Sequence, residues 1–122
     1  MRVLIVDDDR NFAEALDLLV TEEGYAVIGS AANGRDGVEL ALAMRPDVVL
    51  MDVEMPVMDG ILATRETASQ LNGTEVVVLS GSDIEAHILG ARTAGAIAYV
   101  RKDRFREDLP PVLRALAEEH SS

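Results

Sequence analysis

The residues of this sequence with the most chemical potential are carboxylates, a hydroxyl and an amine, each placed directly after a short apolar run. Three consecutive aspartates occupy positions 7–9, and Asp52, Ser80 and Lys102 follow three later runs. Carboxylates that lie close together repel one another, so a cluster of them is costly unless a cation binds among them. Oxygen-only ligands suit Mg²⁺, which takes one or two carboxylates, keeps several waters and accepts phosphate oxygens.

Together these residue types predict phosphoryl chemistry if the fold brings them to one place. A bound Mg²⁺ would admit an anionic phosphoryl group to an acidic site, and Lys102 and Ser80 would add a positive charge and a hydroxyl. Asp52 is then the natural acceptor, because a carboxylate can form an aspartyl phosphate. Taken singly, Asp8 or Asp9 could equally cap a helix. Ser80 alone is typical of a turn and Lys102 alone of a solvated surface, so their coincidence is what favours a site.

Five short apolar runs predict the strands that position these residues. Four of the runs are nearly continuous in apolar residues rather than alternating, which is typical of strands buried on both faces of a parallel sheet. The runs span residues 3–6, 26–28, 48–51, 76–79 and 97–100. The sequence therefore predicts a five-stranded parallel sheet.

Segments with helical spacing separate and follow the runs. Apolar residues three and four positions apart mark helices over 12–20, 38–42, 61–71, 84–91 and 109–117, and glycine or proline stands after each of the first four. Pro56 is expected to fix a turn and Asp59 to cap the third helix. Because proline is tolerated only in a first helical turn, Pro110 and Pro111 place the expected start of the last helix at about Leu109.

Strands and helices alternate five times, which predicts an α/β fold with right-handed crossovers and helices on both faces of the sheet. We expect a flavodoxin-like (βα)5 three-layer sandwich with strand order 2-1-3-4-5, in which ligands bind beyond the carboxyl ends of the strands. In that order the first and third strands are neighbours. Asp7 and Asp8 should therefore lie beside Asp52, with Ser80 and Lys102 flanking them.

Composition limits the possible functions. The 122 residues fit one domain, expected to span 1–122, and 48% hydrophobic residues suffice for a core. With 11 basic and 22 acidic residues the net charge is −11, which argues against direct contact with nucleic acid or an anionic membrane. The chain contains no cysteine, so thiolate chemistry is excluded. No apolar run is long enough for a membrane span, and a cytoplasmic location is expected.

Four pieces of the sequence carry a specific resemblance. They are the acidic cluster at 6–9, the D-x-x-M-P-x-x-D-G segment at 52–60, the Leu-Ser-Gly step at 79–81, and the run from 94 to 103. Over essentially its whole length the chain resembles the receiver domain of two-component response regulators. Asp103 follows Lys102 where many receivers have proline, which looks more like the subgroup with helix-turn-helix output domains.

The resemblance implies a role for each site residue. Asp52 would accept a phosphoryl group from a sensor histidine kinase in a Mg²⁺-dependent reaction, and Lys102 would pair with that group. Asp8, Asp52 and the backbone carbonyl of Glu54 would hold the metal, with Asp7 acting mainly through a bound water. Ser80, where threonine is common, would hydrogen-bond the phosphoryl group, and Tyr99 would be the aromatic whose rotamer reports activation.

The resemblance also implies partners and an output. The domain would catalyse only its own phosphotransfer and autodephosphorylation, so it would not be an enzyme acting on other substrates. It would switch the surface of the fourth helix, fifth strand and last helix, through which it could form a homodimer. Its output would be transcription regulation by an absent or separate DNA-binding domain.

Three other interpretations are weaker. A haloacid-dehalogenase-like phosphatase would use Asp7 as nucleophile and Asp9 as general acid, but its cap insertion has no space in 122 residues. A flavodoxin-like mononucleotide-binding module needs a phosphate loop where residues 7–9 are acidic, and these repel such a ligand. A receiver used only for interaction would not need the intact set of Asp8, Asp52, Ser80 and Lys102.

Overall fold

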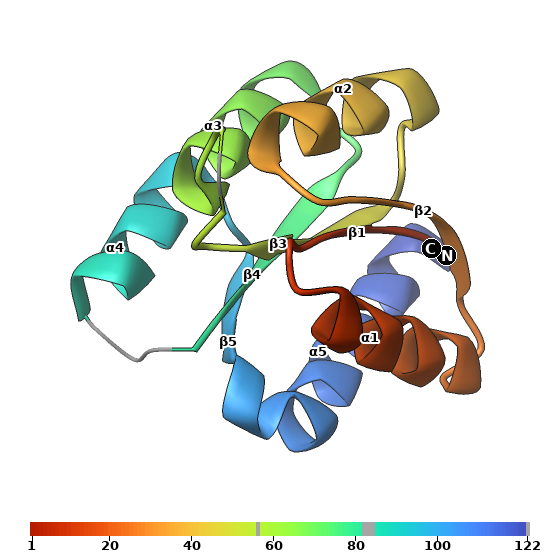
Figure 1. Cartoon of the computed structure of the whole chain (residues 1–122). Helices are drawn as coiled ribbons and strands as arrows, with labels where there is room; N and C mark the ends of the chain where they lie inside the picture. Colours follow the sequence, from red (N-terminus) through yellow and green to blue (C-terminus); the bar gives the residue numbers. More distant parts are fainter. Residues whose placement is uncertain (56, 82–84, 122) are drawn as a thin grey trace.

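The computed structural model describes residues 1–55, 57–81 and 85–121, in which strands and helices alternate from the N-terminus (Figure 1). The strands are β1 (Arg2–Val6), β2 (Ala26–Ala31), β3 (Val48–Asp52), β4 (Glu75–Ser80) and β5 (Ala98–Arg101). The helices are α1 (Arg10–Glu22), α2 (Gly34–Met44), α3 (Gly60–Gln70), α4 (Glu85–Ala94) and α5 (Phe105–Ser121), and a 3-10 turn, η1 (Lys102–Arg104), precedes α5.

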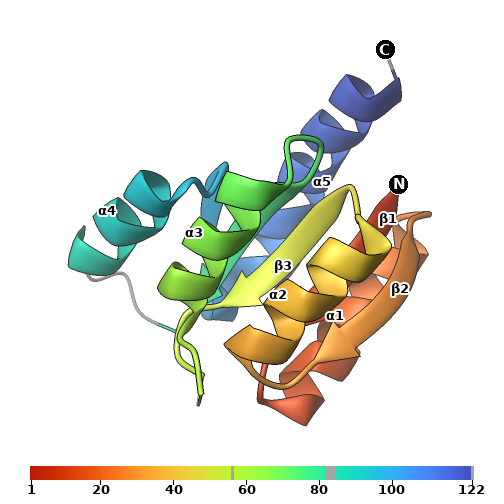
Figure 2. The same ribbon diagram turned by 90° about the horizontal axis from the view of Figure 1, so that it is seen from above.

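All five strands are parallel and lie in the order β2-β1-β3-β4-β5, which confirms the predicted topology. The sheet is the middle of three layers: α1 and α5 cover one face, and α2, α3 and α4 cover the other (Figures 1 and 2). Every residue of β3, the central strand, is buried. This explains the continuous apolar runs, because a strand covered on both faces has no side turned to water.

Two hydrophobic cores lie on the two faces of the sheet. Successive side chains of a strand point to opposite faces. In β1, accordingly, Val3 and Ile5 pack in the core under α1 and α5, while Leu4 and Val6 pack in the core under α2 and α3. The packing on both faces therefore fixes the positions of the residues at the carboxyl ends of the strands.

Side-chain caps start three of the helices. Asp9 accepts a hydrogen bond from the Phe12 N–H, and Asn33 caps α2 in the same way. Asp59 accepts from the Leu62 N–H at 2.9 Å and caps α3, as predicted. Each cap satisfies an amide of the first turn that has no partner within its helix. Two residues of the sequence prediction, Pro56 and Ile84, lie outside the described residues.

The predicted start of the last helix is wrong. α5 begins at Phe105 instead of Leu109, and Pro110 and Pro111 lie inside it. Neither proline can donate to the carbonyls four residues earlier, but those belong to exposed residues that water can reach. Phe105 and Leu109 are buried in the core between the sheet and helices α1 and α5. This burial keeps the first turns of α5 helical in spite of the prolines.

Several strand boundaries differ from the prediction by one residue, and the end of β2 differs by more. β2 continues to Ala31, three residues beyond the predicted end, because Ala31 pairs with Val6 of β1. β5 begins at Ala98, after Ile97, whose side chain is exposed. Pairing with a neighbouring strand, more than the local apolar run, decides where each of these edge strands begins and ends.

Candidate functional site

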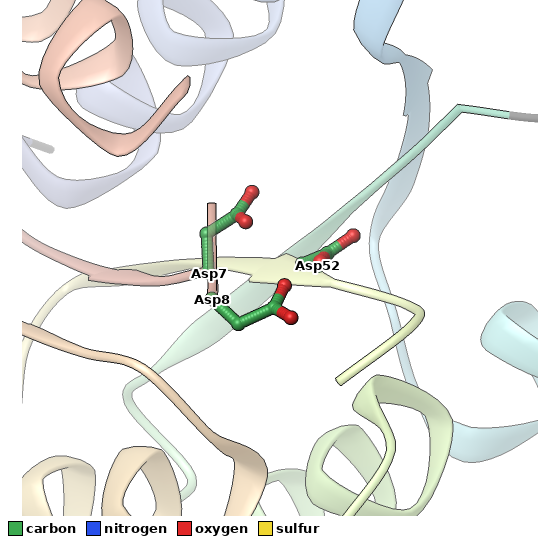
Figure 3. Close-up of side chains that lie close together, drawn as sticks. All are labelled: Asp7, Asp8 and Asp52. Carbon is green, nitrogen blue, oxygen red and sulfur yellow. The ribbon is translucent and has the colours of Figure 1, made fainter. Parts of the chain in front are cut away.

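Three carboxylates meet at the carboxyl ends of β1 and β3. Asp7 and Asp8 follow β1 directly, and Asp52 is the last residue of β3, which pairs with β1. One carboxylate oxygen from each of the three lies within 4.8 Å of the others (Figure 3). Asp7 and Asp52 are buried and Asp8 is exposed, so the cluster is open to solvent on one side. The predicted grouping of these residues is confirmed.

Backbone groups hold Asp7 in place. Its own N–H donates to the carbonyl of Ala31 at 3.0 Å, and its Oδ1 accepts from the Asp9 N–H at 2.8 Å. Asp9 in turn caps α1 through Phe12. The three consecutive aspartates therefore have different surroundings: Asp9 starts a helix, Asp7 is fixed and buried, and Asp8 is exposed at the open side of the cluster.

Lys102 brings a positive charge to the cluster. It follows β5, and its Nζ lies 2.8 Å from Asp7 Oδ2 and 3.2 Å from Asp52 Oδ1. The same ammonium lies 4.6 Å from the centroid of the Phe12 ring, and that ring packs edge-on against Phe105. An ammonium over an aromatic face is attracted by the ring, so α1 helps to aim Lys102 at the two acids. The apolar spacing of Phe12 indicated only a core position, and the sequence carried no signal for this contact.

The site is short of positive charge. Burial and the charge of Asp7 raise the pKa of Asp52 from 3.8 to about 6, although Lys102 pulls it the other way. Burial alone would lower the pKa of Lys102, but its hydrogen bond to Asp7 and the charges of both acids raise it above its ordinary value. One ammonium thus faces three carboxylates. The remaining negative charge and the oxygen-only donor set fit a small divalent cation such as Mg²⁺.

The other predicted site residues lie at the same edge of the sheet or next to it. Ser80 is the buried last residue of β4, one position beyond Leu79, which pairs with Asp52. Gly81 follows it, and nothing lies within 4 Å of where its side chain would begin. Glu54 lies in the loop after β3 and is exposed.

Tyr99 occupies a different position from these residues. It lies on β5, half-buried against the core on the α2, α3 and α4 face. A small cavity of about 60 Å³ lies there, lined by Tyr99 together with residues of α4 that include Ile88 and Ala91. Tyr99 is therefore next to the site along the sheet, and beneath α4.

Gly60 is a residue that the motif contained but whose role sequence reasoning missed. A Cβ on Gly60 would overlap the carbonyl oxygen of Asp52 and come within 2.8 Å of the Val53 Cα. Only glycine lets the start of α3 approach the end of β3 so closely. The D-G pair of the motif is the signal that could have indicated a close backbone approach.

No helix among the described residues is both long enough and apolar enough to cross a lipid bilayer.

The profile of the response regulator receiver domain matches residues 3–114. The transcriptional regulatory protein PdtaR of Mycobacterium tuberculosis is 41% identical over 112 residues, which cover 92% of this chain and 54% of PdtaR. The chain thus spans about half the length of this curated relative.

Solved structures agree with the sequence matches. The signal receiver domain of the putative response regulator NarL from Mycobacterium tuberculosis superposes with a TM-score of 0.89 at 31% identity, covering 96% of this chain and 95% of that one. A CheY from Borrelia burgdorferi, solved as a CheX-CheY-BeF3-Mg+2 complex, gives a TM-score of 0.83 at 25% identity, covering 93% and 89%. With the family profile matched over almost the whole chain, and with its acidic cluster at the carboxyl edge of a 2-1-3-4-5 sheet, this chain belongs to the family of response regulator receiver domains.

Proposed function

We propose that Asp52 accepts a phosphoryl group from the phosphohistidine of a sensor kinase in a Mg²⁺-dependent reaction. The observation that carries the proposal is the surroundings of Asp52. It is a buried carboxylate at the end of the central strand, grouped with Asp7 and Asp8, and 3.2 Å from the ammonium of Lys102. Of the three carboxylates only Asp52 lies on β3. A Cβ on Gly81, which follows Ser80, would meet no atom within 4 Å, and this open space would let a donor approach.

The metal would be held by Asp8, Asp52 and the carbonyl of Glu54, with Asp7 acting through a water. When bound, Mg²⁺ supplies positive charge for the phosphoryl oxygens. The side chains of the site carry out the transfer itself. An ionised Asp52 oxygen attacks phosphorus, the O–P bond forms, and the P–N bond breaks with its electron pair left on the imidazole nitrogen, which takes up a proton. Lys102 then pairs with a phosphoryl oxygen in place of the free Asp52 carboxylate, and Ser80 donates a hydrogen bond.

The raised pKa of Asp52 is compatible with this role. A carboxyl with a pKa of about 6 is mostly ionised at pH 7.5, so the nucleophile is available without a separate base. A cation among the three acids favours the ionised form further. The metal would therefore promote binding of the phosphoryl group and ionisation of its acceptor together.

We further propose that residues 1–122 form one receiver unit whose phosphorylation controls transcription through a DNA-binding region elsewhere. PdtaR is a transcriptional regulatory protein, and the matched residues make up 54% of it, which supports control of transcription by a further region. The change would pass from Ser80 to Tyr99 and then to the surface of α4, β5 and α5, where Leu89 is 62% exposed and could contact a second copy. A histidine kinase as donor implies a cytoplasmic location, and the domain itself would touch neither nucleic acid nor membrane.

Labelling with acetyl phosphate tests the acceptor. Mass spectrometry should find one phosphoryl group on Asp52 in the presence of Mg²⁺ and none in EDTA or in Asp52→Asn. Asp17→Asn, an exposed carboxylate change on α1, is the matched control and should label like the parent protein. A label on Asp7 would support the phosphatase-like alternative and overturn the proposal.

The proposed switch has its own test. Beryllofluoride mimics the phosphoryl group, and the CheY of Borrelia burgdorferi was solved with BeF3 and Mg²⁺. Amide NMR shifts on its addition should extend from Asp52 to α4 and β5. If they stay in the loops around Asp52, the proposed switch surface is wrong.

A further inference from the structure

The start of α2 is in direct contact with the loop that joins β3 to α3. Gly34 is the buried first residue of α2, and the cap residue Asn33 accepts a hydrogen bond from the Asp36 N–H. A Cβ on Gly34 would overlap the carbonyl oxygen of Met58 and come within 2.8 Å of its carbonyl carbon. Figure 2 shows the beginning of α2 beside this loop. The obstacle is backbone, so no side-chain rotation could make room for alanine.

The other end of the same loop is in contact with the proposed phosphoacceptor. Gly60 lies two residues after Met58, and its Cα packs on the carbonyl of Asp52. The Gly60 N–H donates to the Val53 carbonyl at 2.7 Å. The loop is therefore held between α2 on one side and the last residue of β3 on the other.

The conformation of the loop costs free energy that its own residues do not recover. Val57 has φ 72°, in the left-handed region that β-branched residues strongly disfavour. Its side chain is 71% exposed, so it gains little burial in return. Such a conformation persists only where the surroundings impose it. The contacts of Met58 with Gly34 and of Gly60 with Asp52 are among those that hold the loop, together with the packing of Met58 against the core.

We propose that Gly34 is a positioning residue for the phosphoryl site: by letting Met58 pack on α2, it sets where residues 53–55 and 57–59 lie relative to Asp52. The inference rests on the proposed function, in which Asp52 and the carbonyl of Glu54 hold Mg²⁺. A side chain at position 34 would push Met58 outward. Because the loop is short and fixed at Gly60, the displacement would reach Glu54, whose carbonyl is the proposed metal ligand next to Asp52. Gly34 thus acts through the loop and touches neither metal nor phosphoryl group.

Gly34→Ala tests this inference against two glycine controls. Gly95→Ala is a matched destabilising change, because Gly95 has φ 112° and its Cβ would come within 2.7 Å of Ala68 Cβ, far from the loop. Gly73→Ala is a matched neutral change, since nothing lies within 4 Å of its Cβ. Urea unfolding of each variant shows how much stability it loses. Mg²⁺ titration followed by NMR, at a temperature where each variant is folded, then measures the site itself.

We expect Gly34→Ala to raise the Mg²⁺ dissociation constant at least tenfold, to slow acetyl phosphate labelling in parallel, and to shift the amide signals of residues 52–55 before any metal is added. Both controls should keep the parent dissociation constant within twofold. A folded Gly34→Ala protein with parent-like Mg²⁺ affinity would overturn the inference. An equal loss of Mg²⁺ affinity in Gly95→Ala would also overturn it, because the loss would then follow from lower stability of the whole domain.

A second variant covers the case in which Gly34→Ala does not fold. Val57→Gly relieves the strained φ but also frees the loop to leave its position, so it should weaken Mg²⁺ binding at least threefold without lowering stability. Unchanged affinity would overturn the inference. If the parent protein neither binds Mg²⁺ nor accepts phosphate, the proposed function fails, and the metal-free amide shifts of residues 52–55 still decide whether Gly34 positions the loop.

Discussion

Replacing Asp52 by asparagine should stabilise the metal-free domain at neutral pH, and the gain should disappear in acid. Asp52 is 4% exposed at the end of β3. Burial and the charge of Asp7 raise its pKa from 3.8 to about 6. The folded domain therefore keeps a proton on Asp52 at pH values where the unfolded chain has already released it.

The sign and size of the effect follow from this difference. Stability contributed by the protonated form is fully present below a pH of about 4 and is lost as the pH rises through about 6. A difference of about two pKa units corresponds to a loss on the order of 3 kcal/mol in the free energy of unfolding at pH 7.5. Asparagine has nearly the shape of the protonated acid and cannot ionise. The stability of Asp52→Asn minus that of the parent therefore isolates the ionisation of one residue.

Urea unfolding in EDTA at several pH values measures that difference. It should grow from near zero at pH 4 to about 3 kcal/mol in favour of the variant at pH 7.5. Asp17→Asn changes an exposed carboxylate in the same way and should stay within about 0.5 kcal/mol of the parent throughout. Added Mg²⁺ should stabilise the parent by about 2.7 kcal/mol at a hundred times its dissociation constant, and the variant by less. A variant that is less stable than the parent at pH 7.5, or a difference that does not change with pH, would refute the reasoning.

Three further predictions follow from single residues. Phe105→Ala should lower the free energy of unfolding, measured in urea, by about 3 kcal/mol, because α5 begins at this buried residue. A negligible loss would indicate that the helix begins near Leu109 instead. Val57→Asn should raise the free energy of unfolding by about 1 kcal/mol in thermal or urea melts, since asparagine tolerates the left-handed region, and a loss would contradict the strain argument. Lys102→Ala should raise the pKa of Asp52 above its value of about 6, because Lys102 is the charge that lowers it. Carbon-13 NMR titration of the Asp52 carboxyl group measures this pKa, and a lower value in the variant would contradict the prediction.

The sequence alone was enough to predict the sheet and the edge at which the site lies. A strand buried on both faces must be apolar at every position, so β1, β3 and β4 could be located to within one residue from their runs. Alternation of strands and helices then implies parallel strands whose carboxyl ends share one edge. The grouping of Asp7, Asp8 and Asp52 follows from these two local facts together with the strand order, and the structure confirms it.

Other features depend on segments that are distant in the sequence, and only the tertiary structure decided them. Phe105 packs in the core and keeps α5 helical through two prolines, because burial outweighs local helix propensity. The 2.8 Å contact of Lys102 with Asp7 and the raised pKa of Asp52 depend on which charges the fold buries together. The fit of Gly34 against Met58 depends on the distance between a helix and a loop. Local patterns predict which residues are apolar, polar or free to turn. Contacts, burial and electrostatic fields are properties of pairs in space, and they exist only once the layers have packed.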